Sequence, residues 1–466
     1  MFNNLIVGKL NLSSIEEPNA LCFRRDITSK RASFFVFLAL ALVFLLFVPN
    51  EAYAEKKSDK KYANVKTQKR HSVGRKCGKK LEKSQDEMEV EQWIKAESTL
   101  KGALPKVCGS SYEKSQVWNY LAYVFYSNGK ISQAIDAYKK VISEPATDER
   151  TRVNSYYSIA QLFFVKENYS KAAQFLEKWM KESTVVGADG KILLAQAYYQ
   201  LNRKKEALNL VNRTIKNWEI KGKVPKENWW SLQRVMYYEK NNYAEVVVIL
   251  KKLIKHYSRV TYWKQLGSIY GELNQDLNQL ISTEVVYLLG DIKKEKELLG
   301  FASLFIAADA PYLAARVVDK GISQGVIEVT AKNMEFLGYS WELAQNGKKA
   351  RVSLEKAAKL SDQGKIWARL ANVYLDIGAD AQAVQAARMA IKKGGLRRSD
   401  VTNMVLGNAQ LNLHCYGSAI KAFRKAAKDK RSRKSANQWI QYADKENGRR
   451  SKLRQVGASL AGCVHA

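Results

Sequence analysis

The chain has 466 residues, and its 77 lysine and arginine residues against 45 aspartate and glutamate residues give a formal net charge of +32. Because 46% of the residues are hydrophobic and only 6 are proline and 26 glycine, the composition favours a well-packed protein that is helical nearly throughout. It argues against a β-sandwich, a collagen-like rod and a polytopic membrane protein, and 4 histidines leave little scope for metal or acid–base chemistry.

Residues 1–54 have the three parts of a secretory signal peptide. Basic residues precede an uncharged apolar run at 34–48, and Ala52 and Ala54 supply the small residues of a cleavage site. The apolar run is shorter than the roughly 20 residues that a membrane-spanning helix needs. We therefore expect cleavage after Ala54 and a periplasmic mature chain, in which disulfides can form. The alternative is an uncleaved segment that anchors the chain in the inner membrane.

Residues 55–76 follow the signal and are basic, with almost no large apolar side chains. Such a composition cannot bury a core, so we expect a basic disordered arm. This arm is either a solvated spacer or a segment that attracts an acidic partner, a lipid headgroup or a polymer.

Residues 77–427 repeat a pattern every 33 to 38 residues. Trp263 to Tyr270 reads W-x2-L-G-x2-Y, the signature of the first helix of a tetratricopeptide repeat (TPR). The small residue of this signature recurs at Ser84, Ala122, Ala160, Ala195, Gln233, Gly267, Ala302, Gly338, Ala371 and Gly407. A small residue of the second helix follows at Ala96, Ala134, Ala172, Ala207, Ala314, Ala350, Ala383 and Ala419. The pattern predicts an all-α, TPR-type α-solenoid of about nine to ten helix-turn-helix repeats.

Some parts of the chain depart from this pattern. Ser84 is a poor core residue, as expected for a terminal repeat that faces solvent, and an alanine displaced to Ala244 indicates a one-residue shift. The second helix of the sixth repeat, which contains Gln279, fits least well. After the repeats we expect a connector and capping helix at 428–447 and a basic flexible tail at 448–466.

The first helix of each pair lines the inner, concave surface of a TPR solenoid. In the N-terminal half, the positions that point away from the core are mainly aromatic or carry amides. These predicted partner-binding residues are Asn119, Tyr123, Tyr126, Asn154, Tyr157, Gln161, Phe164, Gln196, Tyr199, Trp230, Arg234, Tyr237 and Tyr238. Amides can bond an extended peptide, and aromatic rings give contact area at low entropic cost. Of adjacent aromatics such as Trp229 and Trp230, we expect one in the core and one in the groove; the alternative is that these rings only complete packing between repeats.

Four cysteines follow the predicted signal peptide. Cys77 begins the first helix pair and Cys108 follows its end, so antiparallel helices would bring the two thiols together and permit a disulfide in an oxidising compartment. Cys415 and Cys463 could also bond, but nothing in the sequence positions them.

We predict no catalytic, cofactor-binding or metal-binding residues. Gly321 to Gly325 fits G-x-S-x-G, but the serine falls at the end of a helix, whereas a nucleophile elbow joins a strand to a helix. The net charge of +32 is compatible with nucleic acid, yet the lysines are dispersed over every repeat and an export signal precedes them. We therefore expect protein or peptide partners and no nucleic acid, with peripheral contact with the membrane or wall as a further option.

Seven stretches carry a more specific likeness: CGKKLEKSQDEME (77–89), QVWNYLAYVFY (116–126), LLAQAYYQL (193–201), PKENWWSLQRVMYYEKNNY (225–243), YWKQLGSIYGEL (262–273), DAPYLAARVVDKGI (309–322) and KDKRSRKSANQWIQYADKE (428–446). With these stretches the chain resembles a family of periplasmic TPR proteins found with TonB energy-transduction systems in Gram-negative bacteria. The resemblance implies a non-catalytic accessory of a TonB–ExbB–ExbD-type complex, which powers outer-membrane uptake of iron carriers, and it supports the pairing of Cys77 with Cys108. The alternatives are a scaffold for other cell-envelope assembly machinery and a binder of an anionic envelope polymer.

Overall fold

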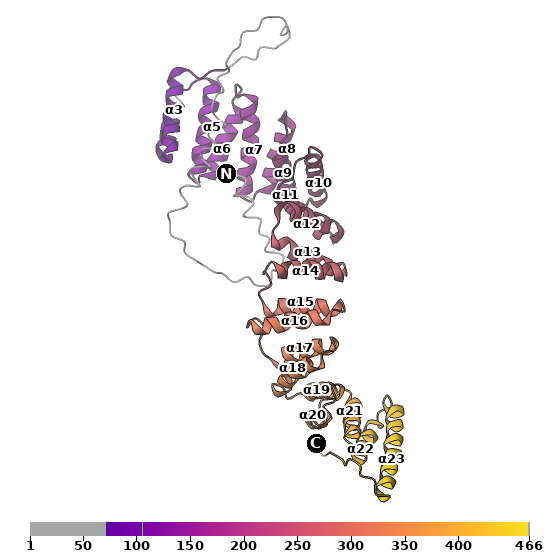
Figure 1. Ribbon diagram of the computed structural model, residues 1–466. Coiled ribbons are helices and arrows are strands. Elements are labelled where there is room, and N and C mark those ends of the chain that lie inside the picture. The colour runs from indigo at the N-terminus through magenta and orange to yellow at the C-terminus, as the bar shows by residue number, and fades with distance from the viewer. Residues whose placement is uncertain (1–70, 105, 465–466) are drawn as a thin grey trace, which may run out of the picture. The chain divides into compact units, whose positions relative to one another are not determined.

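The computed structural model describes residues 71–104 and 106–464, and the chain divides into two compact units, Met1–Lys240 and Asn241–Ala466. Every regular element in the described residues is a helix, and no strand occurs among them (Figure 1). The predicted signal peptide at 1–54, and the predicted arm up to residue 70, lie outside the described residues.

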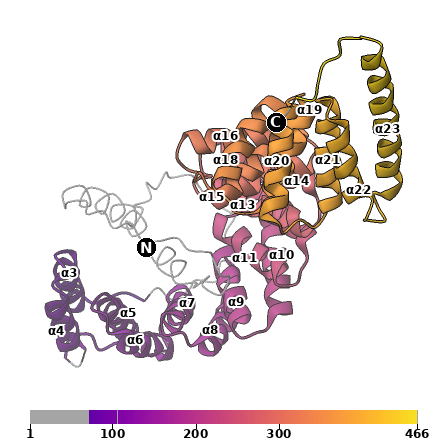
Figure 2. The same ribbon diagram turned by 90° about the horizontal axis from the view of Figure 1, so that it is seen from below.

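Unit 1 consists of antiparallel helix pairs. In chain order its helices are α3 (Arg75–Glu89), α4 (Trp93–Ala103), α5 (Ser111–Ser127), α6 (Ile131–Ser143), α7 (Glu149–Val165), α8 (Tyr169–Glu182), α9 (Ala188–Gln200), α10 (Lys204–Ile220) and α11 (Glu227–Tyr238). Each odd-numbered helix up to α9 packs against the even-numbered helix that follows it. In Figure 2 the odd-numbered helices of this unit form the inner layer of an arc, and the even-numbered helices form the outer layer.

Unit 2 continues the same alternation. Its helices are α12 (Tyr243–Tyr257), α13 (Val260–Glu272), α14 (Asp276–Leu288), α15 (Glu295–Ala307), α16 (Pro311–Ser323), α17 (Ala331–Leu343), α18 (Gly347–Lys359), α19 (Gly364–Asp376), α20 (Asp380–Lys393), α21 (Ser399–Asn412), α22 (Tyr416–Ala426) and α23 (Arg433–Gln455). From α13 to α22 the helices pack in pairs, and α23 packs on α22 as a last, unpaired helix.

The core of both units is built on the predicted small residues. The eight alanines predicted for the second helices are all 0% exposed. Glycine is required where a first helix touches its partner most closely, because a Cβ atom at Gly338 would lie 2.6 Å from Leu354 and one at Gly407 would lie 2.4 Å from Phe423. The predicted all-α, TPR-type solenoid is therefore confirmed.

The turn inside each pair has the same backbone conformation. A single residue with positive φ ends the first helix, as at Gly129 (φ 72°), Asn202 (φ 59°) and Asn274 (φ 52°). Glycine and asparagine tolerate this left-handed conformation best, and the next N–H then returns to a carbonyl in the last turn of the helix. One such bond joins the N–H of Arg203 to the carbonyl of Tyr198 at 2.8 Å.

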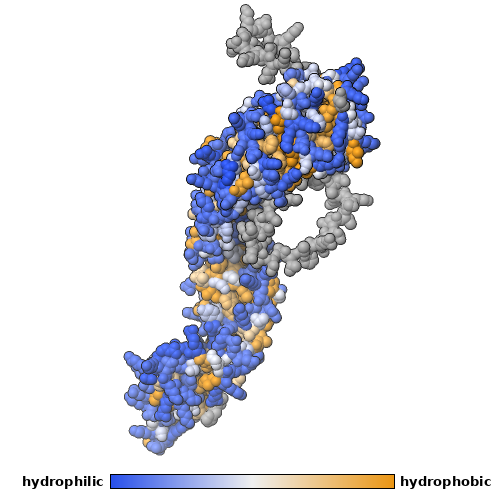
Figure 3. Space-filling model, turned by 180° about the vertical axis from the view of Figure 1, so that it is seen from behind, coloured by the Kyte–Doolittle hydropathy of each residue, from blue (hydrophilic) through white to orange (hydrophobic). Residues whose placement is uncertain are grey.

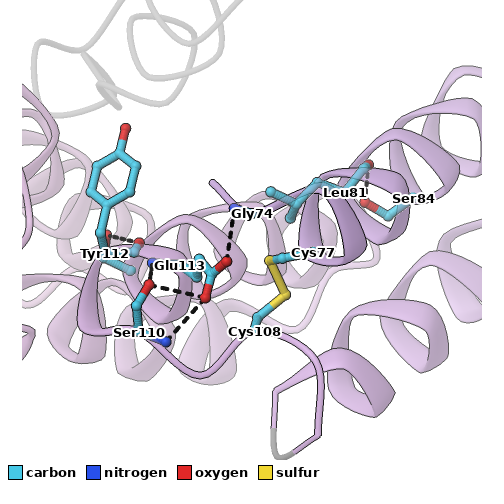
Figure 4. Close-up of a disulfide and its surroundings, with 9 residues drawn as sticks. Gly74, Cys77, Leu81, Ser84, Cys108, Ser110, Tyr112 and Glu113 are labelled. Carbon is cyan, nitrogen blue, oxygen red and sulfur yellow. Dashed lines mark hydrogen bonds between the residues drawn. A yellow bond between two sulfur atoms is a disulfide. The ribbon is translucent and has the colours of Figure 1, made fainter. Parts of the chain in front are cut away.

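A disulfide ties down the first helix pair. Cys77 in α3 and Cys108 after α4 are bonded, with Cα atoms 5.1 Å apart (Figure 4). Beside it, Glu113 closes a capping box with Ser110 at the start of α5 and accepts a hydrogen bond from the N–H of Gly74 at 2.9 Å. Burial opposes the charge on this carboxylate, but these hydrogen bonds outweigh it and lower the pKa of Glu113.

Two features at the N-terminal end differ from expectation. Helix α3 begins at Arg75, so the last two residues of the predicted arm are helical. Ser84, a poor core residue at the small position of the first repeat, is nevertheless 0% exposed. It is tolerated in the core because its hydroxyl donates to the carbonyl of Leu81 at 2.6 Å, which leaves no unsatisfied polar group.

The C-terminal end is also fastened to the repeats. The flexible tail predicted from Gly448 instead continues α23 as far as Gln455. Beyond it, Cys463 forms a disulfide with Cys415, with Cα atoms 4.5 Å apart, and the N–H of Val464 donates to the carbonyl of Leu413 at 3.1 Å.

A buried carboxylate connects α21 to the segment before α23. Asp400 is 3% exposed and accepts hydrogen bonds from Arg398 at 2.8 Å and from the hydroxyl of Ser432 at 2.6 Å. The bond from Arg398 is the main reason why the pKa of Asp400 lies below its ordinary value.

Candidate partner-binding surface

Polar contacts link neighbouring first helices along the inner layer of unit 1. Gln85 on α3 donates to the hydroxyl of Tyr120 on α5 at 2.6 Å, and Lys226 beside α11 pairs with Asp189 on α9 at 2.7 Å. The hydroxyl of Tyr199 on α9 donates to the Glu239 carboxylate just after α11. These contacts were not predicted from the sequence. The feature of the sequence that could have predicted them is the placement of complementary polar residues about one repeat apart.

Three predicted binding residues are exposed. Tyr123 on α5 is 45% exposed and Tyr238 on α11 is 37% exposed, and Asn154 on α7 is exposed as well. The ring of Tyr123 also contacts Trp93 edge to face, with centroids 6.1 Å apart, so its orientation is supported from one side while its other side faces solvent.

Six further predicted residues are half-buried: Asn119, Tyr126, Tyr157, Tyr199, Arg234 and Tyr237. The ring of Tyr157 packs on Trp179, with centroids 5.3 Å apart. Burial, and then the negative charge of Asp189, raise the pKa of Tyr157 to about 12. The ring of Tyr157 therefore completes the packing between helices, which is one of the two roles that the sequence left open.

Four predicted residues are corrected by the structure, because they are buried: Gln161 (5% exposed), Phe164 (9%), Gln196 (6%) and Trp230 (1%). The residues at 159–164 in α7 and at 192–197 in α9 are all buried, so both helices are covered on every side over these turns. A single apolar stripe predicts one covered side only.

The two adjacent tryptophans at the start of α11 also differ from expectation. Trp229 and Trp230 are each 1% exposed, so the expectation of one core ring and one groove ring is wrong for this pair. Trp229 packs edge to face on Trp218, with centroids 5.2 Å apart. Neighbouring positions on a helix point about 100° apart, and both can be covered where packing extends around more than one side.

The first helices of unit 2 present a different, charged surface. Glu335 on α17 lies 3.4 Å from Lys365, and Glu342 on the same helix lies 3.6 Å from Arg369 on α19. Burial is the main cause that raises the pKa of Glu342. Ion pairs join α17 to α19 on this surface, whereas the predicted binding positions of unit 1 are mainly aromatic or carry amides, so unit 1 is the better candidate for peptide binding.

Two absences hold for the part of the chain that the structure describes. None of its helices combines the length and the apolar character needed to span a membrane. No group of three or more histidine, cysteine, aspartate or glutamate side chains is placed there so as to hold a metal ion.

Comparison with known proteins is consistent with this architecture. Residues 99–221, which run from α4 to the end of α10, match the family described as the RNPP family C-terminal domain. No curated protein matches the sequence.

Solved structures with some likeness include a tetratricopeptide repeat protein from Parabacteroides merdae (17% identity, 62% of this chain and 94% of that chain covered, TM-score 0.35). Others are YrrB, a TPR protein with an unusual peptide-binding site (15%, 36% and 83%, TM-score 0.31), and the Cut9–Hcn1 part of the APC/C (13%, 78% and 89%, TM-score 0.29). At these scores the fold assignment depends on the helix pairs of the chain itself. The chain is a TPR-like array of helix pairs.

Proposed function

We propose that this chain is a non-catalytic scaffold that binds an extended segment of a partner protein on the inner layer of unit 1. The observation that carries the proposal is an exposed or half-buried aromatic or amide side chain on each of four successive first helices. These are Tyr123 on α5, Asn154 and Tyr157 on α7, Tyr199 on α9, and Tyr238 on α11. Such groups bind a backbone and pack against side chains without requiring one particular sequence.

The spacing of these helices fixes the length of peptide that can use all of them. Packed helices lie about 10 Å apart, so the three steps from α5 to α11 span about 30 Å. An extended peptide advances about 3.3 Å per residue. A segment of about nine residues would therefore reach from Tyr123 to Tyr238, and shorter peptides would lose one end of the surface.

The proposed setting is the periplasm of a Gram-negative cell, where the scaffold would serve a TonB–ExbB–ExbD-type complex that powers uptake of iron carriers. Three observations support this setting: the signal-peptide pattern at 1–54, the sequence likeness to TonB-associated TPR proteins, and two disulfides, which persist in oxidising compartments. Sequencing the N-terminus of the mature chain tests the first point, and it should begin at Glu55.

The decisive experiment is affinity capture from envelope extracts with two matched variants. Tyr123→Ala/Asn154→Ala/Tyr238→Ala removes accessible groups from three first helices. The control, Gln133→Ala/Gln174→Ala/Asn209→Ala, removes three exposed side chains, smaller than the tyrosines, from α6, α8 and α10. We expect the first variant to bind its partner at least about tenfold more weakly and the control to bind normally. Equal recovery by both variants would remove the inner layer as the binding surface.

A second candidate function is favoured by the net charge of +32. A binder of an anionic envelope polymer would depend on many lysines spread over the molecule, so its affinity would fall steeply with salt. Capture by aromatic and amide groups would change little between about 50 and 200 mM salt. A steep loss, equal in the wild type and in both variants, would favour the polymer.

A further inference from the structure

At two register positions the outer face of α14 is apolar where most other second helices are polar. In six other second helices the position of Leu288 is polar: Ser143, Lys181, Lys216, Ser323, Lys359 and Lys392. The position of Ile281 is also polar in five of them, at Asp136, Gln174, Asn209, Arg316 and Gln385, and it is Val352 in α18. In α14, Leu277, Ile281 and Leu288 follow one another at spacings of four and seven residues, which places them on one face.

This face is accessible. Leu277 is 65% exposed, Ile281 is 47% exposed and Leu288 is 74% exposed. Isolated exposed leucines are common on proteins, but these three residues share one face of α14 and form an apolar ridge that Glu284 interrupts between Ile281 and Leu288. Figure 3 shows apolar surface, drawn in orange, between hydrophilic surface on the face of the molecule that is seen from behind.

A groove runs beside the ridge, between α14 and α16. It consists of two adjoining cavities of about 460 and 330 Å³, which share Tyr287, Leu288 and Lys320 as lining residues. The larger cavity is walled by the rings of Phe301, Phe305, Tyr312 and Trp341. Its volume falls within the range of about 300–1,000 Å³ that is usual for ligand pockets.

The rim of the groove has more positive than negative groups. Arg316 and Lys320 on α16 and Lys349 on α18 line the larger cavity, together with the acids Glu284 and Asp319. Two of the cations lie over rings: Lys320 is 5.7 Å from the centroid of Tyr287 and Lys349 is 4.3 Å from that of Trp341.

None of these three cations forms an ion pair within 4.0 Å among the residues that the structure describes. The side of the groove formed by α16 and α18 is therefore open to a partner with negative charge.

We propose that this groove binds an amphipathic α-helix of a partner protein, with apolar anchors at helical spacing and acidic residues along the flank that faces α16 and α18. A ridge with intervals of four and seven residues packs against the ridges of another helix. The aromatic cavity beside it accepts the anchoring side chains in the manner of helix-in-groove recognition. A flat lipid surface fits less well, because it cannot follow a concave cavity.

The test uses the full chain and three synthetic peptides in fluorescence anisotropy. The first is an acidic helix with leucines at i, i+3, i+4 and i+7, the second has the same composition with the leucines scattered around the helix, and the third has lysine in place of glutamate. The chain variant is Ile281→Gln/Leu288→Ser, which restores residue types found in the other repeats at these positions. Ile391→Gln, at a 38% exposed site on α20, is the matched control.

We expect the acidic amphipathic peptide to bind the wild type, and to bind Ile281→Gln/Leu288→Ser at least about tenfold more weakly, while Ile391→Gln is unaffected. The scattered and lysine peptides should each bind the wild type about tenfold more weakly than the acidic one. Equal binding of the scattered peptide, or no effect of the double variant, would overturn the proposal.

Two other occupants are also distinguished. A concentration-dependent dimer that Ile281→Gln/Leu288→Ser converts to a monomer would show that a second copy occupies the groove. Binding of anionic phospholipid vesicles that the same variant abolishes would show that a lipid surface does. Either result would overturn the proposal of a partner helix. Neither concerns the inner layer of unit 1, which the variant leaves intact.

Discussion

Reduction of the disulfide between Cys77 and Cys108 should loosen the first helix pair and leave the remaining repeats unchanged. The bond closes a loop with a sequence separation of 31 residues. On the chain-entropy estimate, this closure stabilises the closed form by about 3.7 kcal/mol at 25 °C, which is a factor of about 500 in the local opening equilibrium. The effect should be local because α3 and α4 have a neighbouring pair on one side only, and a repeat array gains its stability from neighbour contacts.

Hydrogen exchange measures this opening directly. In the background Cys415→Ala/Cys463→Ala, which leaves the N-terminal disulfide alone, reductant should speed exchange in α3 by up to about 500-fold. Exchange in α19 and α20 should not change. The matched control is Cys77→Ala/Cys108→Ala, in which reductant should have no effect on α3. Unchanged exchange in α3 on reduction would refute the idea that loop closure stabilises the first helix pair. Loss of protection throughout unit 1 would refute the idea that the effect is confined to that pair.

Three further predictions concern the packing and charges. Gly190→Ala should lower the free energy of unfolding of unit 1 by about 1–3 kcal/mol, since its Cβ would lie 2.1 Å from a tryptophan ring. Gly187→Ala, whose Cβ meets nothing within 4 Å, should not lower it. Urea titration followed by fluorescence compares the two variants. The pKa of Tyr157 is raised from 10.0 to about 12 in the folded chain, so its contribution to the free energy of unfolding is complete below pH 10. That contribution is lost between pH 10 and 12, by at most about 1.4 kcal/mol per pH unit. Unfolding of Tyr157→Phe over the same range should lack that loss. Asp400→Asn should lower the free energy of unfolding by about 2 kcal/mol at pH 7, because it weakens the bond from Arg398, and this loss should appear as faster hydrogen exchange in α21. The difference between the variant and the wild type should shrink as the pH falls below 3.8.

The positions that the sequence predicted best are those where the volume of the side chain alone determines which residue fits. A close helix contact admits only alanine or glycine, so the register of small residues located the core of each pair. The fifth repeat departs from this register in the direction opposite to the one suspected: Ala244 is exposed, and Val246, at 0% exposure, takes the buried position of the second helix. The residue with positive φ falls at Asn241, eight positions after Gln233, whereas Asn274 lies seven positions after Gly267.

The sequence predicted the accessible surface less well, because exposure depends on how many neighbours cover a helix. Gln161 and Trp230 occupy the correct face by register, yet they are buried at 5% and 1% exposure. The disulfide between Cys415 and Cys463 could not be predicted either, since it depends on the path of a segment with no repeat pattern. Packing that repeats with the helix period can be predicted from one sequence, but the non-repeating contacts that bury further residues cannot.

The irregular sixth repeat connects the sequence pattern with the proposed groove. Where other second helices bring an alanine into the core, α14 has Gln279, whose amide lies so close that a Cβ on Gly271 would be 2.8 Å from it. A polar residue weakens the inward apolar stripe, while Leu277 and Ile281 strengthen an outward one. Because local departures from a packing rule tend to mark functional positions, the departure and the exposed ridge have one explanation. If so, Gln279→Ala should stabilise α13 and α14 against exchange without altering binding at the groove, whereas Ile281→Gln/Leu288→Ser should abolish binding without altering exchange.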